Sequence, residues 1–397
     1  MAKELINVCL VGQKFMGRTH SNAFLKVGKF FDPPVLPVMH TIAGRNRAEL
    51  EEFKERWGWQ NASVDWKTAV TNPDIGLVDI GTPNHLHKEM SIAALEAGKH
   101  VACEKPLAGT LADAREMRDA AKKAKKSKTF VWYNYRRVPA VALAHQLAKE
   151  GKLGRIFHIR AFYLQDWGGP GVPLLWRFQK KYAGSGAHGD LNAHVIDMAR
   201  FITGDEITEV VGSLAETFVK ERDIIQEGPK GGIAGGTSGG GGKKGKSDVD
   251  DALLFLARTK NGAVASFESS RLATGNQNKN GLEINGEKGS IRFNFEEMNT
   301  LEFYDASVER KQQGWSKIMV THGGDHPYVG NWWPDAHIIG YEHGFINMAA
   351  DMMNILGGKP PVVPMPDFED AYKTQQVLEA ASVSAAERRP VKIAEMK

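Results

Sequence analysis

A lysine follows a short apolar run in the segment Val101–Pro106, whose sequence is Val-Ala-Cys-Glu-Lys-Pro. A lysine at the point where a buried strand stops is partly removed from water, and its amine can then give or take a proton near neutral pH. Lys105 is therefore a candidate catalytic residue. The alternative is an ordinary charge pair, Glu104 with Lys105, at a strand end that Pro106 terminates.

A second group of ionisable residues follows the glycine-rich segment 184–189. Asp190 and His194 are four positions apart at the start of a predicted helix over 191–203, so they share one helix face. A carboxylate beside an imidazole suits the proton transfer that accompanies loss of hydride from an alcohol. A helix cap, Asp190, with a histidine packed behind it explains the pair equally well. A metal site lacks its remaining ligands in the sequence, and we predict none.

A glycine turn between a strand and a helix opens the chain. The apolar run 5–11 predicts a buried strand, and Gly12-Gln13-Lys14-Phe15-Met16-Gly17 leads into a helical pattern. In dinucleotide-binding folds such glycines allow a tight turn and a close backbone approach to the pyrophosphate at the helix N-terminus. Lys14 replaces the middle glycine of that pattern. We expect Gly12, Phe15, Met16 and Gly17 to contact a dinucleotide.

The end of the second predicted strand, over 38–43, bears on the choice of coenzyme. It is followed by Gly44-Arg45-Asn46-Arg47, without the acidic residue that often binds the adenosine ribose there. Arg45 could accept the 2′-phosphate of NADP, whereas Asn46 could hydrogen-bond the ribose of NAD. Two surface arginines at a helix start are an equally good explanation. The sequence thus leaves NAD and NADP open.

The next strand end carries further polar residues. A strand predicted over 76–80 ends in Gly81-Thr82-Pro83-Asn84-His85-Leu86-His87. Strand ends in open parallel sheets line the ligand crevice, so we expect Thr82, Pro83, Asn84 and His87 to contact the coenzyme, with Glu104 and Lys105 at the following strand end. A metal bound by the two histidines is the alternative, and Pro83 at a helix start explains the segment without one.

The order of predicted elements indicates two domains, which 397 residues also favour. Strands and helices alternate through residues 1–135, which is typical of a doubly wound parallel sheet. Residues 136–397 contain strands predicted over 156–163, 207–219, 252–258, 263–269, 282–285, 289–293 and 300–304, which indicates a large, mostly antiparallel sheet. Helices predicted over 341–356 and 367–386 end the chain. The glycine- and lysine-rich segment 228–246 predicts a mobile surface loop.

Composition narrows the function classes. With 25% charged residues and a net charge of +4 the chain gives no reason to expect nucleic acid as a partner. Its two cysteines, Cys9 and Cys103, stand in apolar runs and are predicted to be reduced and buried, as in a cytoplasmic enzyme. Neither a signal peptide nor a membrane span is predicted.

These motifs, taken in order, resemble the family of glucose-fructose oxidoreductase, inositol dehydrogenase and MocA (Gfo/Idh/MocA). The resemblance rests on the glycine turn, Gly81–His85, Glu104-Lys105-Pro106 and the Asp190-x-x-x-His194 pair. It implies a Rossmann domain joined to an α/β domain with a largely antiparallel sheet. It also implies that Lys105, Asp190 and His194 form the catalytic set of an NAD(P)-dependent oxidoreductase, in which His194 takes a hydroxyl proton and Lys105 polarises the oxygen, two roles that could be exchanged.

Other stretches resemble a narrower branch, the levoglucosan dehydrogenases and glycoside 3-dehydrogenases. Aromatic planes interleaved with amide, guanidinium and imidazole groups suit a sugar ring, which has apolar faces and a hydroxyl edge. The expected substrate-binding residues are Tyr135, Arg136, Tyr163, Gln165, Trp176, Arg177, Asp190, His194 and His337. We expect reversible oxidation of a secondary hydroxyl, at C3, of a sugar, anhydrosugar or glycoside. An exposed face of the sheet in the second domain would favour a homodimer or homotetramer. Two rival functions are a glycoside-modifying enzyme that recycles bound nicotinamide and a non-catalytic dinucleotide sensor.

Overall fold

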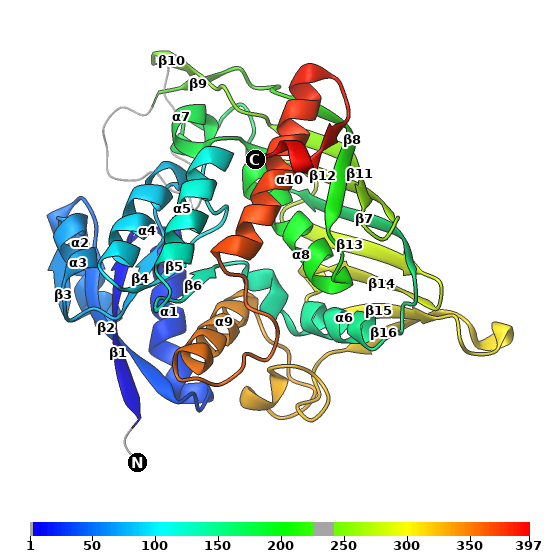
Figure 1. Cartoon of the computed structure of the whole chain (residues 1–397), viewed down its shortest axis with the longest axis horizontal. Helices are drawn as coiled ribbons and strands as arrows, with labels where there is room; N and C mark the ends of the chain where they lie inside the picture. Colours follow the sequence, from blue (N-terminus) through cyan, green and yellow to red (C-terminus); the bar gives the residue numbers. More distant parts are fainter. Residues whose placement is uncertain (1–2, 225–241) are drawn as a thin grey trace. The chain divides into compact units, whose positions relative to one another are not determined.

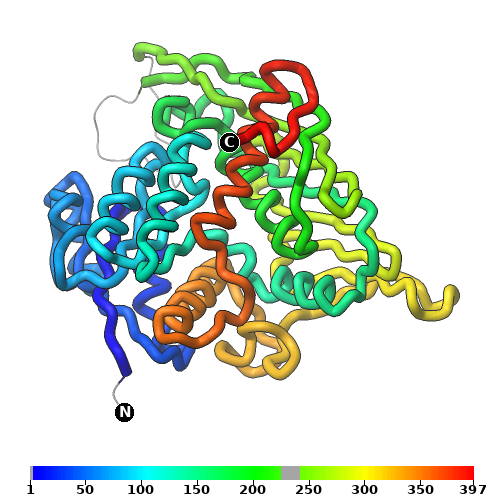
Figure 2. Tube along the Cα trace, viewed as in Figure 1, coloured from blue at the N-terminus to red at the C-terminus, as the bar shows by residue number. Residues whose placement is uncertain are grey.

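The computed structural model describes residues 3–224 and 242–397, which form two compact units (Figure 1). The first unit contains the chain up to Arg137 together with Gly340–Tyr372. The second contains the described residues of 138–339 and Lys373–Lys397. Figure 2 shows residues 340–372, in orange, returning to the N-terminal part of the chain.

A six-stranded parallel sheet forms the centre of the first unit, in the order β3-β2-β1-β4-β5-β6. The sequence folds this way because its central strands are largely apolar, and parallel strands are buried on both faces. In β1, Val8, Cys9 and Leu10 are fully buried, and all four residues of β4 are buried as well. The strands are β1 (Glu4–Val11), β2 (Val35–Ala43), β3 (Asn61–Ser63), β4 (Leu77–Ile80), β5 (His100–Cys103) and β6 (Thr129–Val131).

Helices connect these strands, and side chains cap several of them. Asn46, Asp65 and Thr110 each accept a backbone N–H at a helix start, which satisfies donors that the helix itself leaves unpaired. The helices of this unit are α1 (Phe15–Phe30), α2 (Arg47–Trp57), α3 (Trp66–Thr71), η1 (Asn84–Leu86), α4 (His87–Glu96), α5 (Leu111–Lys123), η2 (Asn134–Arg137) and α9 (Tyr341–Leu356). Because the strand order reverses between β1 and β4, the ends of these strands mark the position where such folds bind ligands.

The second unit is built on a sheet that has nine strands within the described residues, in the order β16-β15-β14-β13-β7-β12-β11-β8-β17. Only β7 and β12 pair in parallel in that described sheet; its other pairs are antiparallel. The strands are β7 (Ile156–Leu164), β8 (Ile207–Glu216), β11 (Ala252–Thr259), β12 (Val264–Ser270), β13 (Lys279–Gly286), β14 (Gly289–Asn294), β15 (Thr300–Asp305), β16 (Trp315–Met319) and β17 (Val391–Lys392). A separate ribbon pairs β9 (Glu221–Asp223) with β10 (Lys244–Lys246).

Buried and exposed side chains alternate along the strands of this sheet, so helices cover one of its faces and the other face is open. In β11, Leu253 and Phe255 are buried while Leu254 and Leu256 are exposed, the pattern of a sheet packed on one side only. Helices contact the covered face, among them α6 and α8. The unit's helical segments include α6 (Pro139–Lys149), η3 (Trp176–Phe178), α7 (Lys180–Ala183), the π-helical turn η4 (His188–Asn192), α8 (Ala193–Thr203), η5 (Phe295–Glu297), η6 (Arg310–Gln312), η7 (Val329–Asn331) and η8 (Ile393–Glu395). Helix α10 (Phe368–Glu387) begins in the first unit and continues in this one.

The fold class predicted from the sequence is confirmed, and the differences are local. The strand predicted over 207–219 ends at Glu216, and the short strands β3, β9, β16 and β17 were not predicted. The helix predicted from residue 191 begins instead with the π-helical turn η4. Of the loop predicted over 228–246, residues 228–241 lie outside the described part of the chain. The loop prediction is wrong at Lys244–Lys246, because these residues pair with β9.

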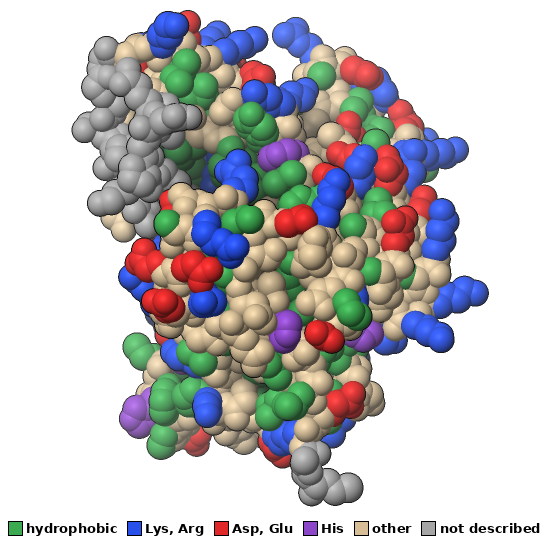
Figure 3. Space-filling view, turned by 90° about the vertical axis from the view of Figure 1, so that its left-hand side faces the viewer, with side chains coloured by type: hydrophobic (Ala, Val, Ile, Leu, Met, Phe, Trp, Pro, Cys, Tyr) green, Lys and Arg blue, Asp and Glu red, His purple; other side chains and the backbone are tan. Residues whose placement is uncertain are grey.

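Two further features of the structure concern its surroundings: the distribution of surface charge and the hydrophobicity of its helices. Figure 3 shows acidic and basic side chains intermixed on the face that it displays, without a continuous field of one sign. Within residues 3–224 and 242–397, no helix is both long and apolar enough to cross a lipid bilayer.

Candidate active site

Close backbone packing surrounds the glycine turn after β1. Gly12 has a φ of +118°, which L-residues rarely adopt, and a Cβ there would lie 2.7 Å from the carbonyl oxygen of Gly81. A Cβ on Gly17 would lie 2.1 Å from the carbonyl oxygen of Gly12. Phe15 and Met16 are the first residues of α1, so they stand at its N-terminus. The turn therefore leaves backbone and the positive end of a helix dipole available, which fits the pyrophosphate of a dinucleotide.

An acidic residue of α2 lies beside the glycine turn, although the sequence has no acidic residue directly after β2. The Nζ atom of Lys14 pairs with Oε2 of Glu49 at 2.5 Å, and Gln13 Nε2 lies 3.5 Å from the same oxygen. Asn46 caps α2 by accepting the backbone N–H of Glu49 at 3.3 Å, while Arg45 precedes the cap. Lys14 thus supplies backbone to the turn while its side chain forms a solvent-exposed ion pair with Glu49. Glu49 lies six positions after the end of β2, so the sequence pattern did not identify it.

His87 connects two of the segments that follow strand ends. Its Nε2 lies 3.0 Å from the carbonyl oxygen of Thr82, and its Nδ1 lies 3.1 Å from that of Pro106. Burial lowers the pKa of this imidazole, although the carbonyl groups and the charge of Glu104 act in the opposite direction. The ring therefore fixes the segment with Thr82, Pro83 and Asn84 against the segment after Lys105. No group of three or more possible metal ligands from His, Cys, Asp and Glu occurs in the described residues.

Lys105 is the second residue after the end of β5, so it lies at a strand end as its sequence predicted. Its backbone N–H donates to Oε2 of Glu104 at 3.1 Å, and its peptide bond to Pro106 is cis. Glu104 is only 5% exposed, and its other oxygen lies 3.0 Å from Nε2 of His20 on α1. The carboxylate that precedes Lys105 is therefore held by buried partners of the first unit.

Two predicted substrate-binding residues, Tyr135 and Arg136, stand in η2 of the first unit, and both are buried. Arg136 forms an ion pair with Asp370 in the first turn of α10. The neighbouring Arg137 pairs with Asp351 of α9 at 3.2 Å. Since buried guanidinium groups require such partners, these contacts anchor η2 to the C-terminal helices of the same unit.

In the second unit a π-helical turn presents Asp190. A Cβ on Gly186 would lie 1.8 Å from the carbonyl oxygen of Asp250, so the turn packs directly against that backbone. The carboxylate of Asp250 accepts the backbone N–H groups of Gly186 and His188, both at 2.7 Å. Asp250 thereby supports a turn of a kind that is frequent at functional sites.

Arg271 holds the carboxylate of Asp190, and sequence reasoning missed it. Its Nη2 donates to Oδ2 of Asp190 at 2.8 Å, and its Nη1 donates to the carbonyl oxygen of Arg177 at 3.1 Å. The side chain of Arg271 is 1% exposed, whereas that of Asp190 is 24% exposed. His194 follows one turn later in α8 and lies against the ring of Tyr163, with ring centroids 5.9 Å apart. The structure thus brings Asp190, His194, Tyr163 and Arg177 into one connected region.

A hydrogen-bonded chain orients the amide of Gln165. Asn278 accepts from Tyr163 Oη at 2.8 Å and from Gln165 Nε2 at 2.7 Å. Trp167 Nε1 donates to Gln165 Oε1 at 2.7 Å. Asn278 was not predicted either, and no local motif marks it.

The remaining predicted residues differ in setting. The guanidinium of Arg177 lies over the ring of Trp176, 4.3 Å from its centroid, and such stacking keeps both groups in fixed orientations. His337 belongs to a loop of the second unit, where its exposed ring contacts the carbonyl oxygen of Pro334 at 2.9 Å. Its ring nitrogen also lies 3.3 Å from the carbonyl oxygen of Asp335, so the described hydrogen bonds of this side chain stay within its own loop and away from Asp190.

Matches to family models agree with both halves of this architecture. Residues 6–133 match the model of an oxidoreductase family with an NAD-binding Rossmann fold, and residues 141–292 match that of the GFO/IDH/MocA C-terminal domain. The chain belongs to the Gfo/Idh/MocA family of oxidoreductases. The resemblance on which the sequence analysis relied is thereby confirmed, and so is the enzyme class.

Individual relatives point to a particular branch of this family. The chain is 43% identical to levoglucosan dehydrogenase of Pseudarthrobacter phenanthrenivorans over 96% of both chains. It is 30% identical to D-glucoside 3-dehydrogenase of Escherichia coli over 56% of this chain and 60% of that one. The solved structure of levoglucosan dehydrogenase in complex with NADH and L-sorbose covers 98% of this chain and 99% of its own, with a TM-score of 0.90 and 41% identity.

Proposed function

We propose that this protein oxidises a secondary hydroxyl, at C3, of a sugar, anhydrosugar or glycoside to the ketone, reversibly and with a nicotinamide coenzyme. The observation that carries the proposal is the carboxylate of Asp190, presented by a π-helical turn one helical turn before His194. The likeness to levoglucosan dehydrogenase and to D-glucoside 3-dehydrogenase supports a carbohydrate as the substrate and C3 as the position.

The residues divide the chemistry between them. His194 takes the hydroxyl proton, and Asp190 orients the substrate by accepting a hydrogen bond from a neighbouring hydroxyl. Lys105 polarises the oxygen and shares the proton. The bound nicotinamide supplies the hydride acceptor. Aromatic side chains and the oriented Gln165 suit the faces and hydroxyls of a pyranose.

NAD is the coenzyme that we propose. The carboxylate of Glu49 stands beside Gln13 and Lys14 of the glycine turn, so it lies where the adenosine ribose binds in this fold. A carboxylate accepts the hydroxyls of an unphosphorylated ribose and repels a 2′-phosphate. Contacts of the glycine turn, Thr82, Pro83, Asn84 and Lys105 with the coenzyme remain part of the proposal.

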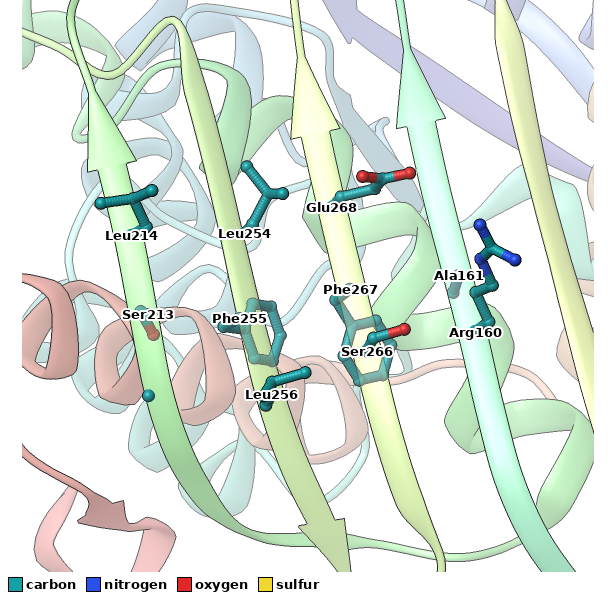
Figure 4. A pocket seen from close by; sticks show the side chains of 11 residues that line it. Arg160, Ala161, Ser213, Leu214, Leu254, Phe255, Leu256, Ser266, Phe267 and Glu268 are labelled. Atoms are coloured by element: carbon teal, nitrogen blue, oxygen red, sulfur yellow. The ribbon is translucent and has the colours of Figure 1, made fainter.

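We also propose that the protein assembles as a homodimer or homotetramer through the open face of the nine-stranded sheet. Figure 4 shows Leu214, Leu254 and Leu256 on neighbouring strands there, flanked by Arg160 and Glu268. The three leucines are 68%, 43% and 58% exposed. Apolar side chains gathered on an open sheet face support an interface between chains.

A substrate panel tests the reaction. We expect absorbance at 340 nm to rise when the purified protein is mixed with NAD and an anhydrosugar or glycoside, and not with inositols alone. Lys105→Ala should abolish turnover while coenzyme affinity stays nearly unchanged, because the lysine acts on the substrate oxygen. Lys122→Ala, at an exposed lysine of α5, is the matched control.

The outcomes separate the rivals. Full activity of Lys105→Ala contradicts the assigned mechanism. Conversion of a glycoside without net NADH indicates recycled coenzyme, and failure of every sugar with either coenzyme indicates a non-catalytic sensor.

A further inference from the structure

A fully buried histidine of α1 stands between two carboxylates in the first unit. Nδ1 of His20 lies 2.9 Å from Oδ2 of Asp79 on β4, and its Nε2 lies 3.0 Å from Oε1 of Glu104 at the end of β5. The imidazole stacks on the indole of Trp132, with centroids 4.1 Å apart. Neither the glycine turn nor the proposed mechanism accounts for this arrangement.

The second oxygen of each carboxylate limits where protons can be, since a carboxyl proton could only face the imidazole. Oδ1 of Asp79 accepts from Trp132 Nε1 at 2.8 Å, and Oε2 of Glu104 accepts from the backbone N–H of Lys105 at 3.1 Å. Both of these partners are donors only, so neither carboxylate has an acceptor for a proton of its own there. The two remaining oxygens face the ring nitrogens, and both contacts are satisfied when both nitrogens carry hydrogen. His20 is then an imidazolium between two ionised carboxylates.

The surroundings favour that charge state. Burial, the largest single influence, lowers the pKa of His20, but the charges and hydrogen bonds of Asp79 and Glu104 outweigh it and raise the pKa to about 9. The other titratable groups near the two carboxylates are Cys9, Cys103 and His87. Burial raises the pKa of Cys9 to about 12 and that of Cys103 well above its usual range, and it lowers the pKa of His87. These three are uncharged near neutrality, so the cluster carries one net negative charge.

We propose that His20, as an imidazolium, is a positioning residue for Lys105: it fixes the carboxylate of Glu104, which in turn holds the backbone N–H of Lys105. Through Asp79 the same ring ties α1, whose N-terminus forms the glycine turn, to the end of β4. The proposal rests on the proposed function in that it takes Lys105 as the catalytic amine. It adds that one buried cation and two buried anions, of which Glu104 directly precedes Lys105 in the chain, contribute to the electrostatic field at the amine.

Nitrogen NMR tests the protonation state without substrate. In protein with ¹⁵N-labelled histidine, we expect both ring nitrogens of His20, identified by their loss in His20→Gln, to show the shifts of imidazolium from pH 6 to pH 8. If His20→Gln does not fold, Glu104→Gln identifies the same signals by perturbing them. A neutral tautomer at pH 7 overturns the proposal.

Hydrogen exchange tests the positioning without turnover. The amide of Lys105 should exchange slowly in the native protein and at least tenfold faster in His20→Gln and in Glu104→Gln, because both substitutions weaken its acceptor. An unchanged amide in both variants overturns the positioning role. Neither the NMR nor the exchange measurement uses a sugar. If the substrate panel fails, the proposed function is therefore refuted while the role of His20 is still tested.

The pH profile distinguishes positioning by charge from simple packing. His20→Gln removes a buried positive charge, which favours the protonated form of the Lys105 amine. The basic limb of kcat/KM, where that amine would lose its proton, should therefore move up by roughly one pH unit. Glu104→Gln removes a negative charge, so the limb should move down by a similar amount. The double variant should return close to the native limb. Loss of activity with an unmoved limb in both single variants shows a merely structural role and overturns the proposal.

Discussion

The carboxylate of Asp190 has a buried cation as its partner, and this changes the role that its sequence context indicated. Asp190 precedes His194 by four positions, which favoured a carboxylate that acts on the imidazole. The structure adds Arg271, whose guanidinium donates to Asp190 and to the carbonyl oxygen of Arg177. Pairing with a guanidinium favours the ionised form of a carboxylate, and this supports the proposal that Asp190 accepts a hydrogen bond from a substrate hydroxyl.

Replacing Arg271 tests this role. Arg271→Met leaves Asp190 without its cation, and we expect kcat/KM for the sugar to fall roughly 10- to 100-fold, as a charged hydrogen bond of about 1.5–3 kcal/mol implies. Arg271→Lys keeps the positive charge but cannot donate to Asp190 and to the carbonyl oxygen of Arg177 with the geometry of a guanidinium. It should therefore recover only part of the activity. Steady-state kinetics with NAD affinity measured alongside provide the comparison. Equal activity of Arg271→Met and the native enzyme refutes the role.

Glu49 gives a second test at the scale of one residue. Because its carboxylate repels a 2′-phosphate, we expect the native enzyme to prefer NAD over NADP. Glu49→Gln should narrow the ratio of the two kcat/KM values about tenfold, which corresponds to about 1.4 kcal/mol. Glu52→Gln, at an exposed position of the same helix, is the matched control. A native preference for NADP would contradict this role of Glu49 and would indicate that Arg45 binds the 2′-phosphate.

At the scale of elements, Asp250 supports the π-helical turn from the segment before β11. Its two oxygens accept the N–H groups of Gly186 and His188, so an asparagine can satisfy only one of them. We expect Asp250→Asn to lower kcat at least tenfold by displacing Asp190, with coenzyme affinity retained. Lys246→Ala, on the exposed ribbon, is the control. A variant with native kcat and a lower melting temperature would limit Asp250 to stability.

Local signals in the sequence located the elements whose residues are close together in the chain. The strand, glycine turn and helix over 4–30 were recognised because Gly12 and Gly17 serve the same local turn. The charged end of β5 was recognised because Glu104, Lys105 and Pro106 are adjacent. By contrast, Glu49 reaches the glycine turn of the first unit, and Asn278 and Arg271 reach the region around Asp190 in the second, only through tertiary packing. No pattern of spacing marks such positions.

The differences in element boundaries have the same origin. The turn at His188–Asn192 is π-helical because Gly186 packs against the backbone of Asp250, which is 64 positions away. β16 is short and mixed in composition, and it exists because β15 pairs with it. Sequence periodicity predicts a helix or strand well when the residues of that element determine its conformation. It predicts less well when a partner far away in the chain determines it.

At the scale of the whole molecule, the open face of the second unit's sheet is the feature that one chain leaves exposed. Leu254 pairs in register with Leu214 on the neighbouring strand, and Leu256 extends the same apolar row. Both leucines alternate with core residues, so a charge at either position alters the open face and leaves the core intact. They are therefore suited to testing assembly separately from folding.

We expect light scattering to give the native protein a mass of two or four times 43.7 kDa. The double variant Leu254→Lys, Leu256→Lys should shift that mass toward the single chain, because like charges would meet across the proposed interface. Leu5→Lys, at a leucine of the first unit that is 64% exposed, should leave the mass unchanged. A native protein that runs as a single chain, or a double variant that assembles as before, contradicts the interface. Activity retained in a monomeric variant would further show that the reaction requires no residue from a second chain.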